Sequence, residues 1–366
     1  MTIKNVFIDR NIAHNEETEA VTSRIDVPVE MACIEDVYTY IRSADDPILR
    51  GKEVLYISEN RGRFLRPCPG TRNYNCCGYW ILHIGTYCLM DCAYCILQSY
   101  FHPPVLQYFI NHDKMTAELD EMFTRNRIHR IGTGEFTDSL IWEHWTNLSS
   151  VLVPVFARHD NAILELKTKT TEINRLKPLH HNRKTIMAWS LNSEAVIQNE
   201  ENATACLTDR LEAAKLCESW GYPLAFHFDP IIIYENCEQD YYDVIERLFS
   251  CISPENIVWI SLGTFRFMAD LKSIIRKRFP NSKITCGEFI PGLDQKMRYF
   301  KPIRISLYRK IITWIRQAAP DVLVYFCMED DEVWRKTLGF TPGEKGGLAR
   351  MLDESAAAHC ELSIQT

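Results

Sequence analysis

Runs of apolar, often β-branched residues alternate with stretches of helical periodicity from about residue 79 onwards. Such alternation is typical of βα units that build a parallel sheet. We therefore expect strands at residues 79–85, 128–134, 162–169, 185–192, 223–229 and 257–263. Helical periodicity lies at residues 115–123, 209–220, 270–279 and about 303–318, and a last apolar run predicts a strand at 322–327.

The two ends of the chain lack this alternation. Residues 1 to about 75 show no clear period-2 strands, and we interpret them as an N-terminal extension that packs on the core. Residues from about 335 are rich in Gly, Ala and charge, which predicts a peripheral tail. The sequence thus predicts three parts: the extension 1–75, a barrel domain 76–302, and a C-terminal helix, strand and tail 303–366.

The composition is that of a globular protein with a large core, since 46% of the 366 residues are hydrophobic. No apolar run reaches the roughly 18 residues of a transmembrane helix, so we expect no membrane partner. The 14 cysteines are scattered and no secretory signal opens the sequence. These features predict reduced thiols and a cytoplasmic protein.

The net charge of -7 argues weakly against nonspecific nucleic-acid binding, for which a basic balance is expected. It leaves open a local basic groove, because lysines and arginines gather in four short segments. A solvated surface is the commoner meaning of each such segment. The segments are residues 61–66, 125–130, 276–278 and 296–301.

Cys88, Cys92 and Cys95 form the most specific motif of the chain, with a C-x3-C-x2-C spacing. Soft thiolate ligands select iron–sulfur clusters, and three of them can ligate three irons of a [4Fe–4S] cluster. The fourth iron would stay open for a substrate or cofactor, as the open position of a catalytic zinc site does. With Tyr94 before the last cysteine, the segment closely resembles the signature of radical S-adenosylmethionine (radical SAM) enzymes.

Zinc binding and a disulfide framework are the alternatives for these cysteines. A zinc site usually needs a second cysteine or histidine pair at similar spacing. No second knuckle of that kind is present, although Cys68, Cys76 and Cys77 lie upstream. We therefore favour the iron–sulfur cluster.

The second predicted strand ends at Gly134 and is followed by the carboxylate of Glu135. In a parallel barrel the chemistry lies at the carboxyl ends of the strands. The pair resembles the Gly-Gly-Glu element of radical SAM enzymes, which implies that it receives the methionyl ammonium of SAM. A carboxylate suits an ammonium, and glycine lets a ligand approach the backbone. A helix N-cap at Thr137 and Asp138 is the structural alternative.

The later strands also end in polar residues. Lys169 suits the SAM carboxylate, or it reaches solvent. Ser190, Asn192 and Ser193 suit a ribose and a carboxylate, or they form a turn. The candidate substrate contacts are His227, Asp229 and Arg266, with a structural His–Asp pair as the alternative for the first two.

The chain as a whole resembles the spore photoproduct lyase-like family of radical SAM enzymes. The resemblance covers about residues 65–327 and rests on segments 92–98, 168–169, 190–193, 209–214 and 265–267 in this order. It implies a partial (β/α)6 TIM-type barrel, a [4Fe–4S] cluster and SAM. It also implies a one-electron donor of the flavodoxin or ferredoxin type, and it leaves DNA open as a partner.

The chain departs from this family where the family returns hydrogen to its substrate. The position of the family's donor cysteine holds Glu135, and a family tyrosine is replaced by Ile96, so that only Tyr94 remains. We therefore expect cleavage of SAM to a 5′-deoxyadenosyl radical that takes hydrogen from an unidentified substrate, with Tyr94 and Glu135 as catalytic residues. The alternatives are a DNA repair lyase for thymine dimers and a non-enzymatic iron–sulfur or zinc protein.

Overall fold

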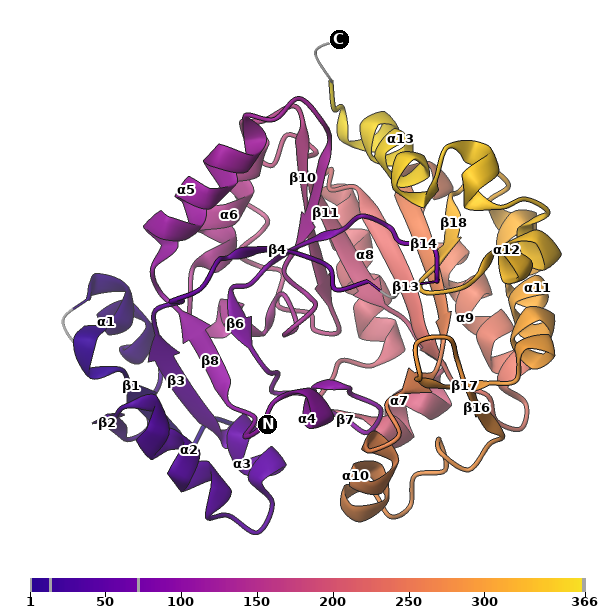
Figure 1. Ribbon diagram of the computed structural model, residues 1–366. Coiled ribbons are helices and arrows are strands. Elements are labelled where there is room, and N and C mark those ends of the chain that lie inside the picture. The colour runs from indigo at the N-terminus through magenta and orange to yellow at the C-terminus, as the bar shows by residue number, and fades with distance from the viewer. Residues whose placement is uncertain (1, 13–14, 71–72, 364–366) are drawn as a thin grey trace.

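A computed structural model describes residues 2–12, 15–70 and 73–363. Its centre is a curled sheet of eight strands with helices on the outer face (Figure 1). All neighbouring strands are parallel except β4 (Leu65–Pro67) and β5 (Trp80–Leu82), which form an antiparallel pair at one edge. In spatial order the strands are β18 (Val324–Phe326), β14 (Ile257–Thr264), β13 (Leu224–Ile231), β11 (Thr185–Ser190), β10 (Ala162–Thr168), β9 (His129–Gly132), β5 (Trp80–Leu82) and β4 (Leu65–Pro67).

This sheet confirms the predicted partial TIM-type barrel, and six predicted strands differ from the observed ones only at their ends. The strand expected at 79–85 is instead divided between two sheets. β5 pairs with β9, whereas β6 (Gly85–Thr86) pairs with β8 (Leu106–Phe109) of a second sheet. The chain passes from one sheet to the other through His83 and Ile84, and both residues are buried. A continuous apolar run therefore concealed the break.

The helices of the barrel follow its strands. The expected helices are confirmed as α5 (His112–Phe123), α8 (Leu207–Ser219), α10 (Leu271–Arg278) and α11 (Lys301–Ala318). Further helices are α4 (Leu97–Tyr100), α6 (Leu148–Ala157), α7 (Glu194–Glu200), α9 (Cys237–Cys251), α12 (Asp331–Leu338) and α13 (Leu348–Cys360).

The N-terminal residues form strands that the sequence did not predict. They build a second sheet in the order β2 (Val29–Met31), β1 (Asn5–Ile8), β3 (Val54–Ser58), β8 and β6, with helices α1 (Glu16–Thr22), α2 (Ile34–Arg42) and α3 (Pro47–Glu53). All five residues of β3 are buried, so the strand has no alternation to detect. This sheet takes strands from both sides of residue 75, and the division of the chain into three parts stays a prediction.

The tail is not peripheral as a whole. α13 packs against β14, and its Leu348, Met351 and Leu352 are buried. The Ser355 hydroxyl also donates a hydrogen bond to the Val258 carbonyl oxygen, at 2.5 Å. Burial of one apolar helix face stabilises the far edge of the barrel sheet.

Two small sheets complete the fold. The first, in the order β15 (Arg266–Phe267), β17 (Met297–Tyr299) and β16 (Phe289–Pro291), is antiparallel. The second pairs β7 (Asp91–Cys92) of the cysteine loop with β12 (Glu201–Asn202). The loop that carries the cysteines is therefore tied to the segment after α7.

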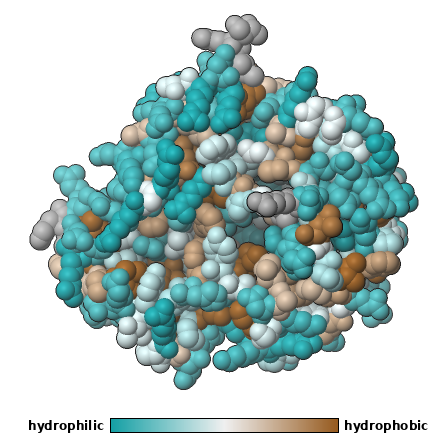
Figure 2. Space-filling view, in the orientation of Figure 1, coloured by the Kyte–Doolittle hydropathy of each residue, from teal (hydrophilic) through white to brown (hydrophobic). Residues whose placement is uncertain are grey.

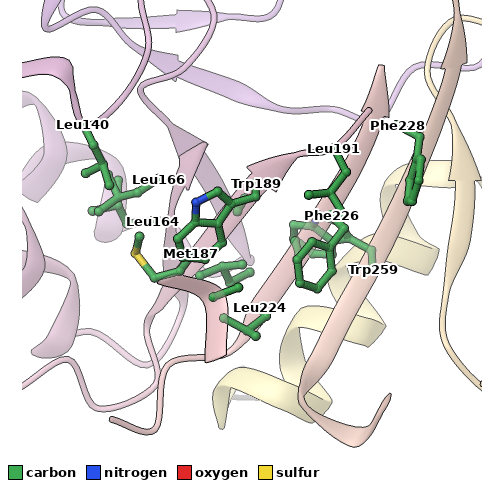
Figure 3. Close-up of a cluster of buried hydrophobic side chains, with 14 of the residues drawn as sticks. Leu140, Leu164, Leu166, Met187, Trp189, Leu191, Leu224, Phe226, Phe228 and Trp259 are labelled. Atoms are coloured by element: carbon green, nitrogen blue, oxygen red, sulfur yellow. The ribbon is translucent and has the colours of Figure 1, made fainter. Parts of the chain in front are cut away.

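Alternate residues of the barrel strands face two different environments. Leu164, Leu166, Met187 and Trp189 belong to a cluster of buried apolar side chains (Figure 3). Between the two leucines, Glu165 accepts hydrogen bonds from Trp259 Nε1 and pairs with His227 Nε2, at 3.2 and 2.8 Å. The other face of the strands is thus polar, and it leads towards the strand ends where a reaction site is expected.

Candidate active site

A cavity of about 270 Å³ lies where the cysteine loop meets the carboxyl ends of the barrel strands. The face shown in Figure 2 is hollowed near its centre and largely covered by hydrophilic residues. Most of the site residues expected from the sequence line the cavity: Cys88, Cys92, Tyr94, Cys95, Gly134, Glu135, Lys169, Ser190, Asp229 and Arg266. Residues from six separate segments thus converge on one space.

The three cysteines of the motif line this cavity as free thiols. Burial raises the pKa of Cys88 to about 12 and also raises the pKa of Cys92. The backbone N–H of Met90 donates to the Cys88 sulfur at 3.4 Å. Metal ligation needs thiolates, and burial disfavours them. The positive charge of a bound metal centre would stabilise the thiolates and lower their pKa. Three thiols that share one cavity wall therefore fit an iron–sulfur cluster.

No group of three His, Cys, Asp or Glu side chains among the described residues is already arranged as a metal-ion site. The three cysteines and the upstream Cys68, Cys76 and Cys77 are among these residues. Neither the cluster nor the zinc alternative is therefore decided by ligand geometry, and the cluster assignment stays a proposal.

Lys52 of α3 fixes the position of the cysteine loop. Its side chain is fully buried, and its ammonium donates to the carbonyl oxygens of Cys88 and Met90 at 3.0 and 2.5 Å. The ammonium also lies 4.4 Å from the centre of the Tyr87 ring. Lys52 is far from the motif in sequence and carries no local signal, so it was not predicted.

Arg278 holds the other side of the same loop. Its guanidinium donates two hydrogen bonds to the Asp91 carboxylate, at 2.9 and 3.1 Å, and one to Asp46, at 2.9 Å. It also bonds Gln98, whose amide donates to the Cys92 carbonyl oxygen at 3.0 Å. Arg278 belongs to a segment offered above as a basic surface, but its side chain is only 7% exposed. It positions the loop and is not free to contact a phosphate.

Tyr94 belongs to a buried charged network behind the cysteines. Its hydroxyl donates to Glu201, which also pairs with Arg210 at 2.5 Å. Burial acts to raise the pKa of Glu201, but the Arg210 and Lys169 charges outweigh it and hold that pKa below its usual range. Arg210 also donates to the Ser190 carbonyl oxygen at 2.8 Å, which connects the network to the end of β11.

Asp138 lines the cavity and joins the segment after β9 to the end of β10. It accepts hydrogen bonds from the Thr168 hydroxyl and the Lys169 N–H, both at 2.8 Å, and from the Leu140 N–H at 3.0 Å. The last bond lies just ahead of a 3-10 helix at Ile141–His144, whose N-cap is Leu140 and which has no side-chain cap, so Asp138 does not act as the N-cap that the structural alternative supposed. The same carboxylate orients the backbone that carries Lys169.

Glu135 is the cavity carboxylate that the protein leaves unengaged. It forms no hydrogen bond or ion pair with any residue that the structure describes, although it interacts electrostatically with Lys167. A Cβ atom at the neighbouring Gly134 would lie 3.1 Å from Lys167 Cβ, so the close approach of these strands favours glycine there. A carboxylate without a fixed partner is available to a ligand.

Three predicted site residues are engaged elsewhere and do not line the cavity. Asn192 donates to the Pro230 carbonyl oxygen at 2.9 Å and accepts from the Tyr241 hydroxyl at 2.7 Å. Ser193 caps α7 and accepts from the Tyr234 hydroxyl at 2.6 Å. His227 pairs with Glu165, so its partner is not the Asp229 expected from the sequence. The hydrogen bonds of all three side chains therefore hold the strand ends in place and leave these groups no contact with the cavity.

Asp229 instead pairs with Arg266 through two hydrogen bonds of 3.0 Å each, and both residues line the cavity. Lys167 and Lys296 line the same region. Neither lysine was predicted as a site residue, although Lys167 lies only two residues before Lys169 on the same strand face. This part of the cavity is therefore rich in paired and unpaired charge.

No helix in the described part of the chain has the length and apolar character needed to cross a membrane.

The comparisons with known proteins agree with this geometry. The family model for spore photoproduct lyase matches residues 75–300, which is more than half of the chain. Spore photoproduct lyase of Clostridium acetobutylicum is 24% identical over 69% of this chain and 71% of its own length. The Bacillus subtilis enzyme is 27% identical over 61% of this chain and 64% of its own length.

Solved structures show the same fold. A mutant of spore photoproduct lyase with the dinucleoside spore photoproduct matches with a TM-score of 0.80 and 20% identity, over 88% of this chain and 98% of the other. A second mutant, with AdoMet and the same dinucleoside bound, matches with a TM-score of 0.78 and 21% identity over the same shares. The chain belongs to the spore photoproduct lyase family and is a radical SAM enzyme.

Proposed function

We propose that the chain holds a [4Fe–4S] cluster through Cys88, Cys92 and Cys95 and binds SAM in the cavity beside it. The observation that carries the proposal is the convergence of these thiols with Glu135 and Lys169 on a single cavity. When bound and reduced, the cluster supplies one electron for the cleavage of SAM to methionine and a 5′-deoxyadenosyl radical. A flavodoxin- or ferredoxin-type protein is the donor class that we propose.

The residues of the chain bind and orient SAM in this proposal. Glu135 and the backbone at Gly134 receive the ammonium, Lys169 pairs with the carboxylate, and Ser190 faces the ribose. Lys169 lies 5.8 Å from the Tyr94 ring, and Tyr94 is fixed by Glu201. We no longer assign ligand contacts to Asn192, Ser193 and His227, because their polar atoms already form hydrogen bonds within the protein.

The substrate in this proposal occupies the charged region near Asp229 and Arg266, where the 5′-deoxyadenosyl radical takes a hydrogen atom from it. We propose that it differs from the spore photoproduct. The reason lies in the two departures of the sequence, Glu135 and Ile96, at the positions from which the family returns hydrogen.

Repair of a DNA photolesion is the second candidate function. It is favoured by the solved relative that carries the dinucleoside spore photoproduct and by the curated relatives with that enzyme's name. DNA would then be the partner, and its binding would weaken steeply with salt. The non-enzymatic alternative predicts that the reduced protein does not cleave SAM at all.

One experiment separates these functions. The protein is reconstituted anaerobically with iron and sulfide, reduced, and supplied with SAM, and 5′-deoxyadenosine is measured with and without ultraviolet-irradiated DNA. Cys92→Ala should abolish the product, whereas Cys286→Ala, which removes an exposed thiol outside the cavity, should not. No 5′-deoxyadenosine from the wild type would contradict radical chemistry.

The dinucleoside spore photoproduct tests the second candidate directly. We expect the wild type to cleave SAM but to release little repaired dinucleotide from this probe. Efficient repair over many turnovers would contradict the proposal of a different substrate and establish the lesion as the substrate.

A further inference from the structure

Cys327 lies at the carboxyl end of β18, beside the charged part of the cavity. Its backbone N–H donates to the Leu262 carbonyl oxygen at 3.1 Å, which continues the pairing of β18 with β14. The Arg266 guanidinium donates to its sulfur at 3.4 Å. Arg266 lines the cavity, as does Met328, which follows Cys327 in the sequence. Cys327 itself is not among the lining residues, but its sulfur contacts one of them, so the thiol lies one contact behind the proposed substrate position.

The groups around this sulfur include both signs of charge. Arg266 is in direct contact with it, and Lys167 and Lys296 interact with it electrostatically, as do Asp229 and Glu135. Burial raises the pKa of Cys327 to about 11, although Arg266 acts to lower it. The group is thus a thiol near neutral pH and carries a hydrogen atom.

Two further thiols, Cys77 and Cys76, interact in succession with Cys327. The segment before β5 is fastened next to the end of β18 by Asn75, which donates to the Glu329 carbonyl oxygen at 3.3 Å and to the Asp331 carboxylate at 3.0 Å. Cys77 of this segment interacts electrostatically with Cys327 and shares a hydrogen bond with Cys76, which is exposed. Three free thiols therefore interact in succession from the contact with Arg266 to an exposed cysteine.

We propose that Cys327 donates the hydrogen atom that quenches the substrate radical, an inference that rests on the proposed function. A carbon radical takes hydrogen readily from an S–H bond, which is weaker than a C–H or carboxyl O–H bond. Glu135, which occupies the wall where the family's cysteine is expected, offers no such bond. Cys327 supplies it from the neighbouring edge of the barrel.

The step balances in atoms and electrons. The S–H bond of Cys327 breaks homolytically, a C–H bond forms on the substrate carbon, and a thiyl radical remains on the sulfur. One electron and one proton return the thiyl to the thiol. The electron comes from the same class of one-electron donor that reduces the cluster, by way of Cys77 and Cys76.

The test needs no knowledge of the substrate. In the absence of any substrate, a 5′-deoxyadenosyl radical formed in the cavity takes hydrogen from the weakest bonds that it can reach. In D2O the thiols carry deuterium, so the 5′-deoxyadenosine that the reconstituted, dithionite-reduced enzyme makes from SAM should gain one deuterium. We expect Cys327→Ala to lower this labelled fraction by about tenfold, as a barrier higher by a little over 1 kcal/mol would.

Three further variants test whether the label comes from the Cys327 thiol. Cys327→Ser keeps the size and the contact with Arg266 but has a strong O–H bond, so it should lose the label as the alanine variant does. Cys286→Ala should keep it. Unchanged labelling in both Cys327 variants, or loss of label only in Tyr94→Phe, would overturn the proposal. Absence of 5′-deoxyadenosine from every variant and the wild type would instead contradict radical initiation itself, and absence of label in the wild-type product would also overturn the thiol donor.

Discussion

Replacing Lys52 with methionine should destabilise the cysteine loop and lower its capacity for iron. The side chain has no exposed surface, and its ammonium bonds the carbonyl oxygens of Cys88 and Met90. Methionine has a similar length but no donor, so both carbonyl oxygens would lose a charge-assisted hydrogen bond. One of them belongs to a proposed cluster ligand.

The size of the effect follows from opposing terms. Two hydrogen bonds from a charged group contribute about 1.5–3 kcal/mol each. Removing a buried charge relieves part of its desolvation cost, which acts in the opposite direction. Asp91, which lies 3.7 Å from the ammonium, keeps both bonds from Arg278 and is not left alone. We therefore expect the free energy of unfolding to fall by roughly 2–4 kcal/mol.

Urea unfolding of the iron-free protein measures the stability, and iron per chain after anaerobic reconstitution measures the loop. Lys114→Met is a matched control, because Lys114 also bonds two carbonyl oxygens, of Asn60 and Gly62, but is exposed and outside the cavity. The control should bind as much iron as the wild type. If Lys52→Met keeps wild-type stability and iron content, the two hydrogen bonds from Lys52 do not stabilise the cysteine loop, and the prediction is wrong.

The remaining predictions concern the cluster, SAM and pH. Alanine at Cys88, Cys92 or Cys95 should abolish the visible absorbance of the reconstituted protein, and about four irons per chain in the triple variant would contradict the ligand assignment. Glu135→Ala should weaken SAM binding about tenfold or more by removing a charge-assisted bond, while sparing the cluster; equal affinity in a titration would exclude its role as ammonium partner. Burial lowers the pKa of His83 from 6.5 to about 4. Between these two pH values His83 is protonated in the unfolded chain but neutral in the folded chain. The free energy of unfolding should therefore fall by up to roughly 3 kcal/mol as the pH drops from 6.5 to 4. His83→Phe should remove this part of the pH dependence in urea titrations, and an unchanged pH dependence would refute it.

The barrel strands were predictable because each is a contiguous apolar run between turns. The elements that the sequence did not reveal, in the barrel and in the second sheet, were missed for definite reasons. β3 is buried on both faces and shows no alternation, and the run at 79–85 crosses from one sheet to another without a polar break. α13 was read as a tail because its many alanines and charges conceal a narrow apolar face.

The predicted site residues also include some that the sequence identified correctly and some that it did not. Glu135, Lys169 and Ser190 were found because they lie at or just beyond the carboxyl ends of strands that share one edge. Asn192 and Ser193 occupy equivalent sequence positions, yet their polar groups are taken by Pro230, Tyr241 and Tyr234. Which of several polar residues at a strand end remains available depends on the neighbouring strand, and no single stretch of sequence contains that information.

The sequence by itself determined the cysteine motif, the βα alternation and the family, because these depend on spacing along one covalent chain. Tertiary structure alone decided which groups surround the motif. Lys52 and Arg278 reach the cysteine loop from separate parts of the chain, and Cys327 meets Arg266 because β18 lies beside β14. Such contacts depend on strand order and on the curl of the sheet. These properties emerge only when distant segments pack together, because the free energy that selects them is shared across the whole core.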